Sequence, residues 1–228
     1  MDGQKENIFL ITSVINTGNS PYTYTDNRST YTSEQRFDQT LQTIQTIREK
    51  VPSVHIILSE CSELTAEQEK ILTERVDTFI NLYFNEEIRN ACLYSNKKGY
   101  GECLQTYETL CYLLANNMEC KRFFKISGRY FLNDFFQIDT FSTEEYTFNK
   151  MLRGSNCHPT VLYSVPFTLF HHFEQVLLSC KKVYEQQSVG LETLLPPNCT
   201  PAKYSNCVGV SGYVAVDNSF YSPTPNDV

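Results

Sequence analysis

The sequence lacks several patterns that would assign it to a common functional class. No run of lysine and arginine is dense enough for nucleic-acid binding, and the formal net charge of the 228 residues is −7. The first apolar run, residues 8–15, lacks the length and the flanking residues of a membrane span or a signal peptide. We therefore expect no nucleic-acid partner, no transmembrane segment and a cytoplasmic location.

Metal-binding and dinucleotide-binding patterns are also missing. The nine cysteines include no Cys-x-x-Cys pair and the four histidines no His-Glu-x-x-His pattern, which argues against structural zinc. With no secretory signal, the cysteines are expected to be free, mostly buried thiols in a reducing compartment. The loop after the first apolar run contains only Gly18, which argues against a dehydrogenase or methyltransferase with a Gly-x-Gly-x-x-Gly loop.

What is present is an alternation of apolar strands and amphipathic helices. With 41% apolar and 20% charged residues, the chain should fold into a globular domain with a real core. Two Thr-x-x-Gln capping boxes, at Thr32 and Thr65, predict the starts of two helices. Strands are predicted at 8–14, 54–58, 78–82 and 123–126, and helices at 32–51, 65–74 and 102–117. This order predicts an α/β fold with a mainly parallel, doubly wound sheet.

The last third of the chain is more mixed. It predicts strands over 146–152 and 160–165 joined by a turn at 153–159, and then a helix that begins at Pro166. A loop containing Pro196, Pro197 and Pro201 follows. The final predicted strand spans residues 207–216, and the tail Ser222–Val228 is expected to fray.

The segment 95–134 carries the most functional information. A polar loop with Gly99 and Gly101 precedes an amphipathic helix, which leads into an apolar strand and the polar turn 127–130. In open α/β sheets, ligands bind beyond the carboxyl ends of the strands. The glycines allow close approach of the backbone, the helix N-terminus favours an anion, and Lys97 and Lys98 suit a diphosphate.

This order of loop, helix, strand and turn resembles the donor-binding half of GT-A-fold glycosyltransferases. It is also similar to uncharacterised glycosyltransferase-like proteins of large DNA viruses, which would place the protein in host cytoplasm. The resemblance implies a single GT-A-like domain over 1–228. Residues 8–135 would bind a nucleoside diphosphate sugar, residues 136–216 would bind a glycan or small acceptor, and 217–228 would be a tail.

The resemblance also implies which residues would contact the donor. Strand ends and the glycine loop supply most of them, and each also has a structural explanation as a loop cap or surface residue. The predicted donor-binding residues are Thr12, Ser13, Asn16, Glu60, Gly99, Tyr100, Gly101, Lys125 and Ser127. Tyr22, Tyr24 and Tyr31 are candidates for stacking on a base or sugar.

The chain departs from this family at the metal site. GT-A enzymes generally hold Mn²⁺ or Mg²⁺ with Asp-x-Asp, where this sequence has Ser127, Gly128 and Arg129. One interpretation is that Arg129, assisted by Lys125, neutralises the diphosphate without metal. A second is that Asp134, alone or with Asp139, binds the metal, and a third is that Arg129 pairs with a structural carboxylate.

An inverting transfer also needs a base for the acceptor hydroxyl. Glu192, near the start of a predicted helix, is the first candidate, with Glu174, His171 and His172 as alternatives. Glu192 has a structural explanation as well, because a carboxylate is favoured at a helix N-terminus. The predicted function is glycosyl transfer in glycan synthesis. The missing Asp-x-Asp supports an alternative, a catalytically inactive protein that binds a nucleotide or a sugar.

Overall fold

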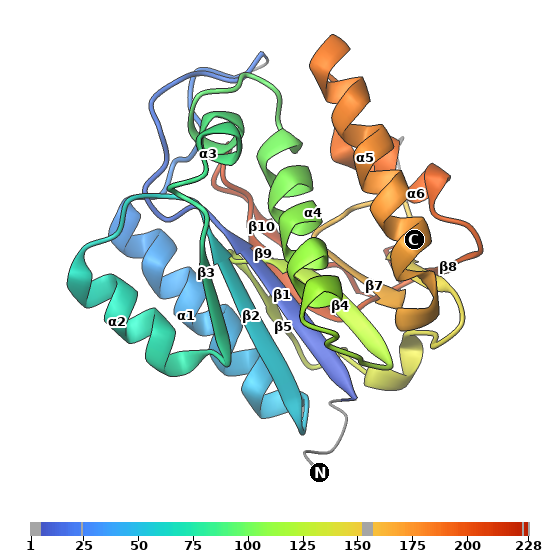
Figure 1. Ribbon diagram of the computed structural model, residues 1–228. Coiled ribbons are helices and arrows are strands. Elements are labelled where there is room, and N and C mark those ends of the chain that lie inside the picture. Colours follow the sequence, from blue (N-terminus) through green and yellow to red (C-terminus); the bar gives the residue numbers. More distant parts are fainter. Residues whose placement is uncertain (1–5, 24, 152–156, 225, 228) are drawn as a thin grey trace.

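The protein is a mixed α/β structure in which helices cover both faces of a seven-stranded sheet (Figure 1). The computed structural model describes residues 6–23, 25–151, 157–224 and 226–227. The strand order of the main sheet is β3-β2-β1-β4-β7-β6-β8. Its strands are β1 (Asn7–Ser13), β2 (Val54–Glu60), β3 (Thr78–Asn81), β4 (Arg122–Ser127), β6 (Tyr146–Asn149), β7 (Leu162–Pro166) and β8 (Ala202–Ser205).

The first four strands of this sheet are parallel. In register, Ile11 of β1 lies between Leu58 of β2 and Ile126 of β4. Strand β7 runs antiparallel to β4 and β6, and β6 pairs in parallel with β8. The prediction of a mainly parallel, Rossmann-like sheet flanked by helices is therefore confirmed.

Among the described residues, six α-helices and a small second sheet complete the fold. The helices are α1 (Ser33–Lys50), α2 (Ala66–Arg75), α3 (Glu86–Leu93), α4 (Tyr100–Ala115), α5 (Phe170–Gln186) and α6 (Leu191–Asn198), with 3₁₀ turns at Ile138–Thr140 and Phe167–Leu169. The second sheet pairs β5 (Tyr130–Leu132), β9 (Val210–Tyr213) and β10 (Phe220–Tyr221). None of the described helices combines the length and apolarity that crossing a bilayer requires.

The apolar core divides into layers on the two faces of the main sheet. Ile8 and Leu10 of β1 face one layer, together with buried residues of α4 and α5. Phe9 and Ile11 face the opposite layer, which contains the buried side of α1 and residues of β5 and β9. Because β1 is buried on both faces, it needs the continuous apolar sequence that predicted it.

Both predicted capping boxes form. The hydroxyls of Thr32 and Thr65 accept hydrogen bonds from the backbone N–H three residues later, and the side chains of Gln35 and Gln68 accept from the capping residues in return. These contacts satisfy N–H groups that a helix start would otherwise leave without partners, so α1 and α2 begin where the sequence predicts.

Several other predictions need correction. Tyr130 belongs to β5 and not to a turn, and Pro196 and Pro197 lie inside α6 and not in a loop. Strands β8 and β10 and helix α3 were not predicted, and β10 ends just before the tail Ser222–Val228 that is expected to fray. The strand predicted over 146–152 ends at Asn149, while residue 152 and part of the predicted turn 153–159 lie outside the described residues.

Candidate functional site

A cavity lies where the order of the parallel strands reverses. The chain builds β1, β2 and β3 outward in one direction and then returns to place β4 on the other side of β1. Such a switch point leaves a crevice beyond the carboxyl ends of the two central strands. The crevice here encloses about 1170 Å³, counting its opening to solvent. We call it the switch-point cavity.

Four chain segments far apart in sequence supply its main walls. They are the end of β1, the first turns of α4, the end of β4 and the segment after β9. The residues they contribute include Thr12, Ser13, Val14, Gly99, Gly101, Glu102, Gln105, Ser127, Gly128, Arg129, Tyr130, Val214, Ala215 and Val216. The loop between β1 and α1 adds Thr17, Tyr22 and Arg28.

The two glycines at the start of α4 are required by packing. Gly99 caps the helix with φ 85°, and a Cβ there would lie 2.6 Å from the hydroxyl of Tyr184. A Cβ on Gly101 would lie 2.8 Å from the Cα of Cys92 on α3. Tyr100 turns away and stacks on Tyr184, with ring centroids 5.2 Å apart. The glycines therefore line the cavity as predicted, and Tyr100 does not.

The cavity is strongly basic although the chain as a whole is acidic. Its lining contains five basic residues and two carboxylates, against a net charge of −7 for the chain. The basic residues are Arg28, Arg36, Lys97, Lys98 and Arg129. Within the described part of the chain, Arg28, Arg36, Lys97 and Arg129 form no ion pair with a carboxylate. No carboxylate lies within ion-pairing distance of these four side chains, although the charge of Glu60 acts on Arg36 from farther away.

Three of these cations, Arg28, Lys97 and Arg36, donate hydrogen bonds to neutral oxygen atoms of the protein. Arg28 donates to the carbonyls of Ser20, Cys92 and Ser95, and Lys97 donates to the carbonyl of Tyr184. Such bonds fix the side chains and leave their charge uncompensated.

Arg36 is the third cation held by neutral oxygens, and it is buried. It donates to the carbonyl of Val14 at 2.7 Å and to the hydroxyl of Ser29 at 3.3 Å. Burial, with a smaller contribution from the neighbouring charge of Arg129, lowers the pKa of Arg36 to about 9. Arg36 therefore keeps its charge at neutral pH, and an anion bound beside it would raise that pKa again.

Arg129 has the clearest capacity for a ligand. Its guanidinium lies 5.7 Å from the centre of the Tyr130 ring, and its buried Nη1 has no hydrogen-bond partner among the described residues. The interpretation that Arg129 pairs with a structural carboxylate finds no such partner in the described part of the chain. A buried N–H without a partner is costly, and an oxygen of a bound anion would satisfy it.

Lys125 does not reach the cavity, contrary to the prediction. Its side chain is 0% exposed, and its ammonium donates to Glu102, to the hydroxyl of Ser127 at 2.9 Å and to the carbonyl of Thr160 at 3.3 Å. Burial lowers the pKa of Lys125, and the charge of Glu102 opposes that shift. All three donors are used internally, so Lys125 cannot contact a diphosphate.

Glu102 is a residue that the sequence interpretation missed. It lies in the first turn of α4, lines the cavity and is 26% exposed. Lys125 holds one carboxylate oxygen, and the hydroxyl of Ser127 approaches the other at 3.4 Å. A carboxylate in the first turn of a helix that follows a glycine loop was a usable signal. Arg28 and Arg36, also missed, had no comparable local signal.

The predicted donor residues near β1 and β2 fall into two groups. Thr12 and Ser13 line the cavity, as predicted. Asn16 instead hydrogen-bonds through its backbone to Ser62 and through its side chain to the Glu63 carbonyl, outside the cavity lining.

Glu60 is 0% exposed and is also not in the cavity lining. Its Oε1 accepts from the backbone of Ile15 at 3.0 Å and from Ser62 at 2.5 Å, while its buried Oε2 has no hydrogen-bond partner among the described residues. Burial raises the pKa of this carboxyl above its ordinary value. Its Oε1 contacts fix the loop after β1, and the carboxylate lies beneath the cavity wall and not on it.

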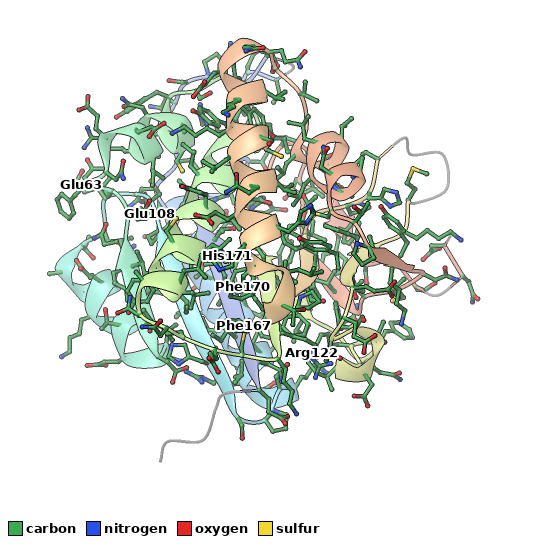
Figure 2. All side chains as sticks on the ribbon, turned by 45° about the vertical axis from the view of Figure 1, so that its right-hand side comes forward. Glu63, Glu108, Arg122, Phe167, Phe170 and His171 are labelled. Carbon is green, nitrogen blue, oxygen red and sulfur yellow. The ribbon has the colours of Figure 1, made fainter. Side chains whose placement is uncertain are left out.

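Among the candidate bases, Glu192 is the one in the cavity lining. It lies in the first turn of α6. His171 and Glu174 approach each other at 3.8 Å on α5, where His171 points outward (Figure 2). The Nδ1 of His172 lies 2.8 Å from the hydroxyl of Tyr146.

The three tyrosines predicted to stack on a base or sugar also differ in where they lie relative to the cavity. Tyr22 lines the cavity, and its ring lies 4.5 Å from the Arg28 guanidinium. Tyr31 packs edge-on against Tyr213 outside the cavity lining, and Tyr24 lies outside the described residues.

The cavity residues do not fit a divalent cation. Asp134 is fully exposed and pairs with Lys50 at 3.0 Å, and Lys50 ends α1 at the opposite, amino edge of the sheet. Asp139 lies in the 3₁₀ turn beyond it and is likewise outside the cavity lining. Glu102 is committed to Lys125, and the described residues contain no cluster of three or more His, Cys, Asp or Glu side chains suited to a metal. A hard cation prefers several anionic oxygens, whereas this lining is mainly cationic.

No protein-family model matches the chain, and no curated protein matches it in sequence.

Proposed function

We propose that this protein is a glycosyltransferase that moves a sugar from a nucleoside diphosphate sugar to an acceptor hydroxyl. In this proposal basic side chains take the place of a metal ion at the diphosphate. The observation that carries it is the set of uncompensated cations in the switch-point cavity, above all Arg129 with its partnerless Nη1. The resemblance of segment 95–134 to GT-A enzymes adds the sugar to what would otherwise be a general anion site.

The position of the cavity supports a phosphate-bearing ligand. The N-terminal end of α4 opens onto it at Gly99 and Gly101, so the partial positive charge of the helix adds to that of the side chains. Thr12 and Ser13 at the end of β1 and Tyr22 in the loop after it line another part of the wall, and they would contact the nucleoside.

The chemistry follows from where charge develops. As the bond between the anomeric carbon and the diphosphate oxygen breaks, its electron pair stays with the diphosphate. Arg129 provides a planar fork of N–H donors for those oxygens, and Arg36 adds charge behind it. In a direct displacement the acceptor oxygen forms the new bond to the anomeric carbon, and its proton passes to the carboxylate of Glu192.

The first experiment is a thermal-shift panel of UDP-, GDP-, dTDP- and CMP-linked sugars, each with Mn²⁺ and with EDTA. We expect one diphosphate donor to raise Tm by several degrees and the shift to persist in EDTA. At about 100-fold excess over Kd, binding stabilises the folded state by about 2.7 kcal/mol. A shift only with Mn²⁺ would contradict the metal-free site, and no shift with any donor would contradict the function.

A transfer assay on the donor that binds then separates the enzyme from its alternative. Consumption of the donor with release of nucleoside diphosphate supports the transferase. Intact binding with neither transfer nor hydrolysis across an acceptor panel identifies a catalytically inactive nucleotide-sugar-binding protein instead.

A further inference from the structure

A second cavity adjoins the first and meets it at Glu192. It encloses about 950 Å³, counting its opening, and lies between the segment before β7 and the loop that joins α5 to α6. Its lining consists of Thr23, Lys98, Cys157, Pro159, Val161, Ser188, Val189, Gly190 and Glu192. Lys98, Val161 and Glu192 line the switch-point cavity as well, so the two spaces share one wall.

The two cavities differ sharply in charge. Away from the shared wall, the second cavity has no charged residue in its described lining, whereas the switch-point cavity has four basic residues of its own. The described lining of the second cavity offers a phosphate or carboxylate a single cation, Lys98, on the shared wall that also carries Glu192, so an anion would gain far less charge compensation there than in the switch-point cavity. The lining therefore disfavours a charged ligand.

The second cavity does offer groups that suit hydroxyls. The side-chain hydroxyls of Thr23 and Ser188 make no hydrogen bond to other described residues, and Ser188 is exposed. Ser188 and Val189 are in neither helix nor strand, and their backbone groups make no hydrogen bond within the described part of the chain. Val161, Val189 and Pro159 supply apolar surface beside them. Such a mixture of apolar faces and scattered donors and acceptors fits an uncharged polyhydroxy compound.

We propose that the second cavity binds the acceptor, and that the acceptor is an uncharged sugar or similar polyhydroxy compound. This inference rests on the proposed function, because it treats the adjoining cavity as the donor site. Glu192 on the shared wall touches both ligands. It takes the proton of the acceptor hydroxyl as that oxygen bonds to the anomeric carbon and the diphosphate leaves toward Arg129.

Saturation-transfer NMR on the full chain tests the site without any donor present. The probes are methyl glucoside and N-acetylglucosamine as neutral sugars, with glucuronate and glucose 6-phosphate as charged counterparts. The variant Ser188→Trp fills the second cavity from an exposed position. Ser179→Trp is the matched control, because Ser179 is exposed on α5 and lines neither cavity.

We expect saturation transfer to a neutral sugar that falls at least fivefold in Ser188→Trp, stays unchanged in Ser179→Trp and survives addition of a nucleoside diphosphate. Any signal from glucose 6-phosphate should be displaced by the nucleoside diphosphate and should be insensitive to Ser188→Trp. Absence of a neutral-sugar signal, its persistence in Ser188→Trp, or its displacement by the nucleoside diphosphate would overturn the inference.

The nucleotide-sugar panel tests the proposed function independently of this NMR experiment. If no nucleotide sugar binds, the transferase proposal fails whatever the neutral sugars do. If a nucleotide sugar binds and Ser188→Trp leaves its Kd unchanged, while the KM of a neutral acceptor rises at least tenfold, the assignment of the second cavity to the acceptor is supported.

Discussion

The amino and carboxyl edges of the main sheet differ in how their charged side chains are paired. At the amino edge three cations pair with carboxylates, Arg48–Asp77 at 2.8 Å, Lys50–Asp134 at 3.0 Å and Lys121–Glu6 at 2.6 Å, while Arg122 donates to the neutral oxygens of Asn7, Ile138 and Phe141. At the carboxyl edge, Arg36 and Arg129 contact no carboxylate in the described part of the chain. Charges that are paired within the protein stabilise the fold and are not available to a ligand. Charges left uncompensated around a cavity are what a ligand of opposite sign requires.

Lys125 and Glu102 form an ion pair at the carboxyl edge, and breaking this pair should have the largest effect on stability. Glu102→Gln leaves the 0% exposed ammonium of Lys125 without its anion. We expect a loss of about 3–5 kcal/mol in the free energy of unfolding, measured by urea denaturation at pH 7. The double variant Glu102→Gln with Lys125→Met should recover much of that loss, because no buried charge is left. A loss below about 1 kcal/mol for Glu102→Gln would contradict the importance of this pair.

Arg129 should have the next largest effect, on binding and not on stability. We expect Arg129→Ala to raise the Kd of the preferred nucleoside diphosphate by about 10–100-fold in calorimetry, because about 1.5–3 kcal/mol of charge-assisted hydrogen bonding is lost. Arg129→Lys keeps the charge without the fork and should fall between. Arg48→Ala, the control at the amino edge, should leave Kd unchanged. An unchanged Kd in Arg129→Ala would contradict the proposal that Arg129 binds the diphosphate.

Two carboxylates, buried Glu60 near the carboxyl edge and more exposed Asp77 at the amino edge, should respond to pH with opposite signs. Burial raises the folded-state pKa of Glu60 above its ordinary 4.5. Between these two values the folded state keeps a proton that the unfolded state has released. The free energy of unfolding should therefore fall as pH rises through that window, and Glu60→Gln should remove this component.

For Asp77, burial acts to raise the pKa, but hydrogen bonds from the Ile56 backbone and from Arg48 together lower it below its ordinary 3.8. The ionised Asp77 carboxylate therefore contributes to the free energy of unfolding above its ordinary pKa, and this contribution is lost as pH falls through the folded-state pKa. The variant Asp77→Asn should remove this pH-dependent contribution. Urea midpoints from pH 3 to pH 8 for both variants check the signs. A midpoint difference between wild type and Glu60→Gln that is constant across the range would contradict the assignment for Glu60.

The smallest effect is expected at Asp134, the alternative metal ligand at the amino edge. Because its pair with Lys50 is exposed, Asp134→Asn should cost no more than about 0.5 kcal/mol in the free energy of unfolding. Nucleotide-sugar binding in Mn²⁺ should match wild type. If this variant alone loses binding in Mn²⁺, the amino edge holds a functional metal and the contrast between the edges fails.

Local patterns were enough to predict most of the central fold. The apolar runs of β1 and β2 and the capping boxes at Thr32 and Thr65 each act within a few residues, so they can be recognised in sequence. Strands β5, β8 and β10 have two to four residues each and exist because of partners far away in the chain. Helix α3 did carry a signal, an Asn85 cap followed by Glu86 and Glu87.

One rule explains both which site residues were predicted correctly and which were not. The rule that ligands bind beyond parallel strand ends places Thr12, Ser13, Ser127 and Arg129 at the cavity, where all four lie. It says nothing about which polar side chains near that edge are already engaged. The partner of Lys125 lies in α4, 23 residues earlier. Such pairings depend on the packed structure and not on local sequence.

The segment that follows β9 has a consequence for how the protein is made. Val214, Ala215 and Val216 line the switch-point cavity, and the carbonyl of Ala215 accepts hydrogen bonds from the backbone and hydroxyl of Thr30 in the loop after β1. Synthesis runs from the N-terminus, so the four parallel strands emerge from the ribosome long before this wall does. A nascent chain can assemble its central sheet while its ligand site is still open on one side.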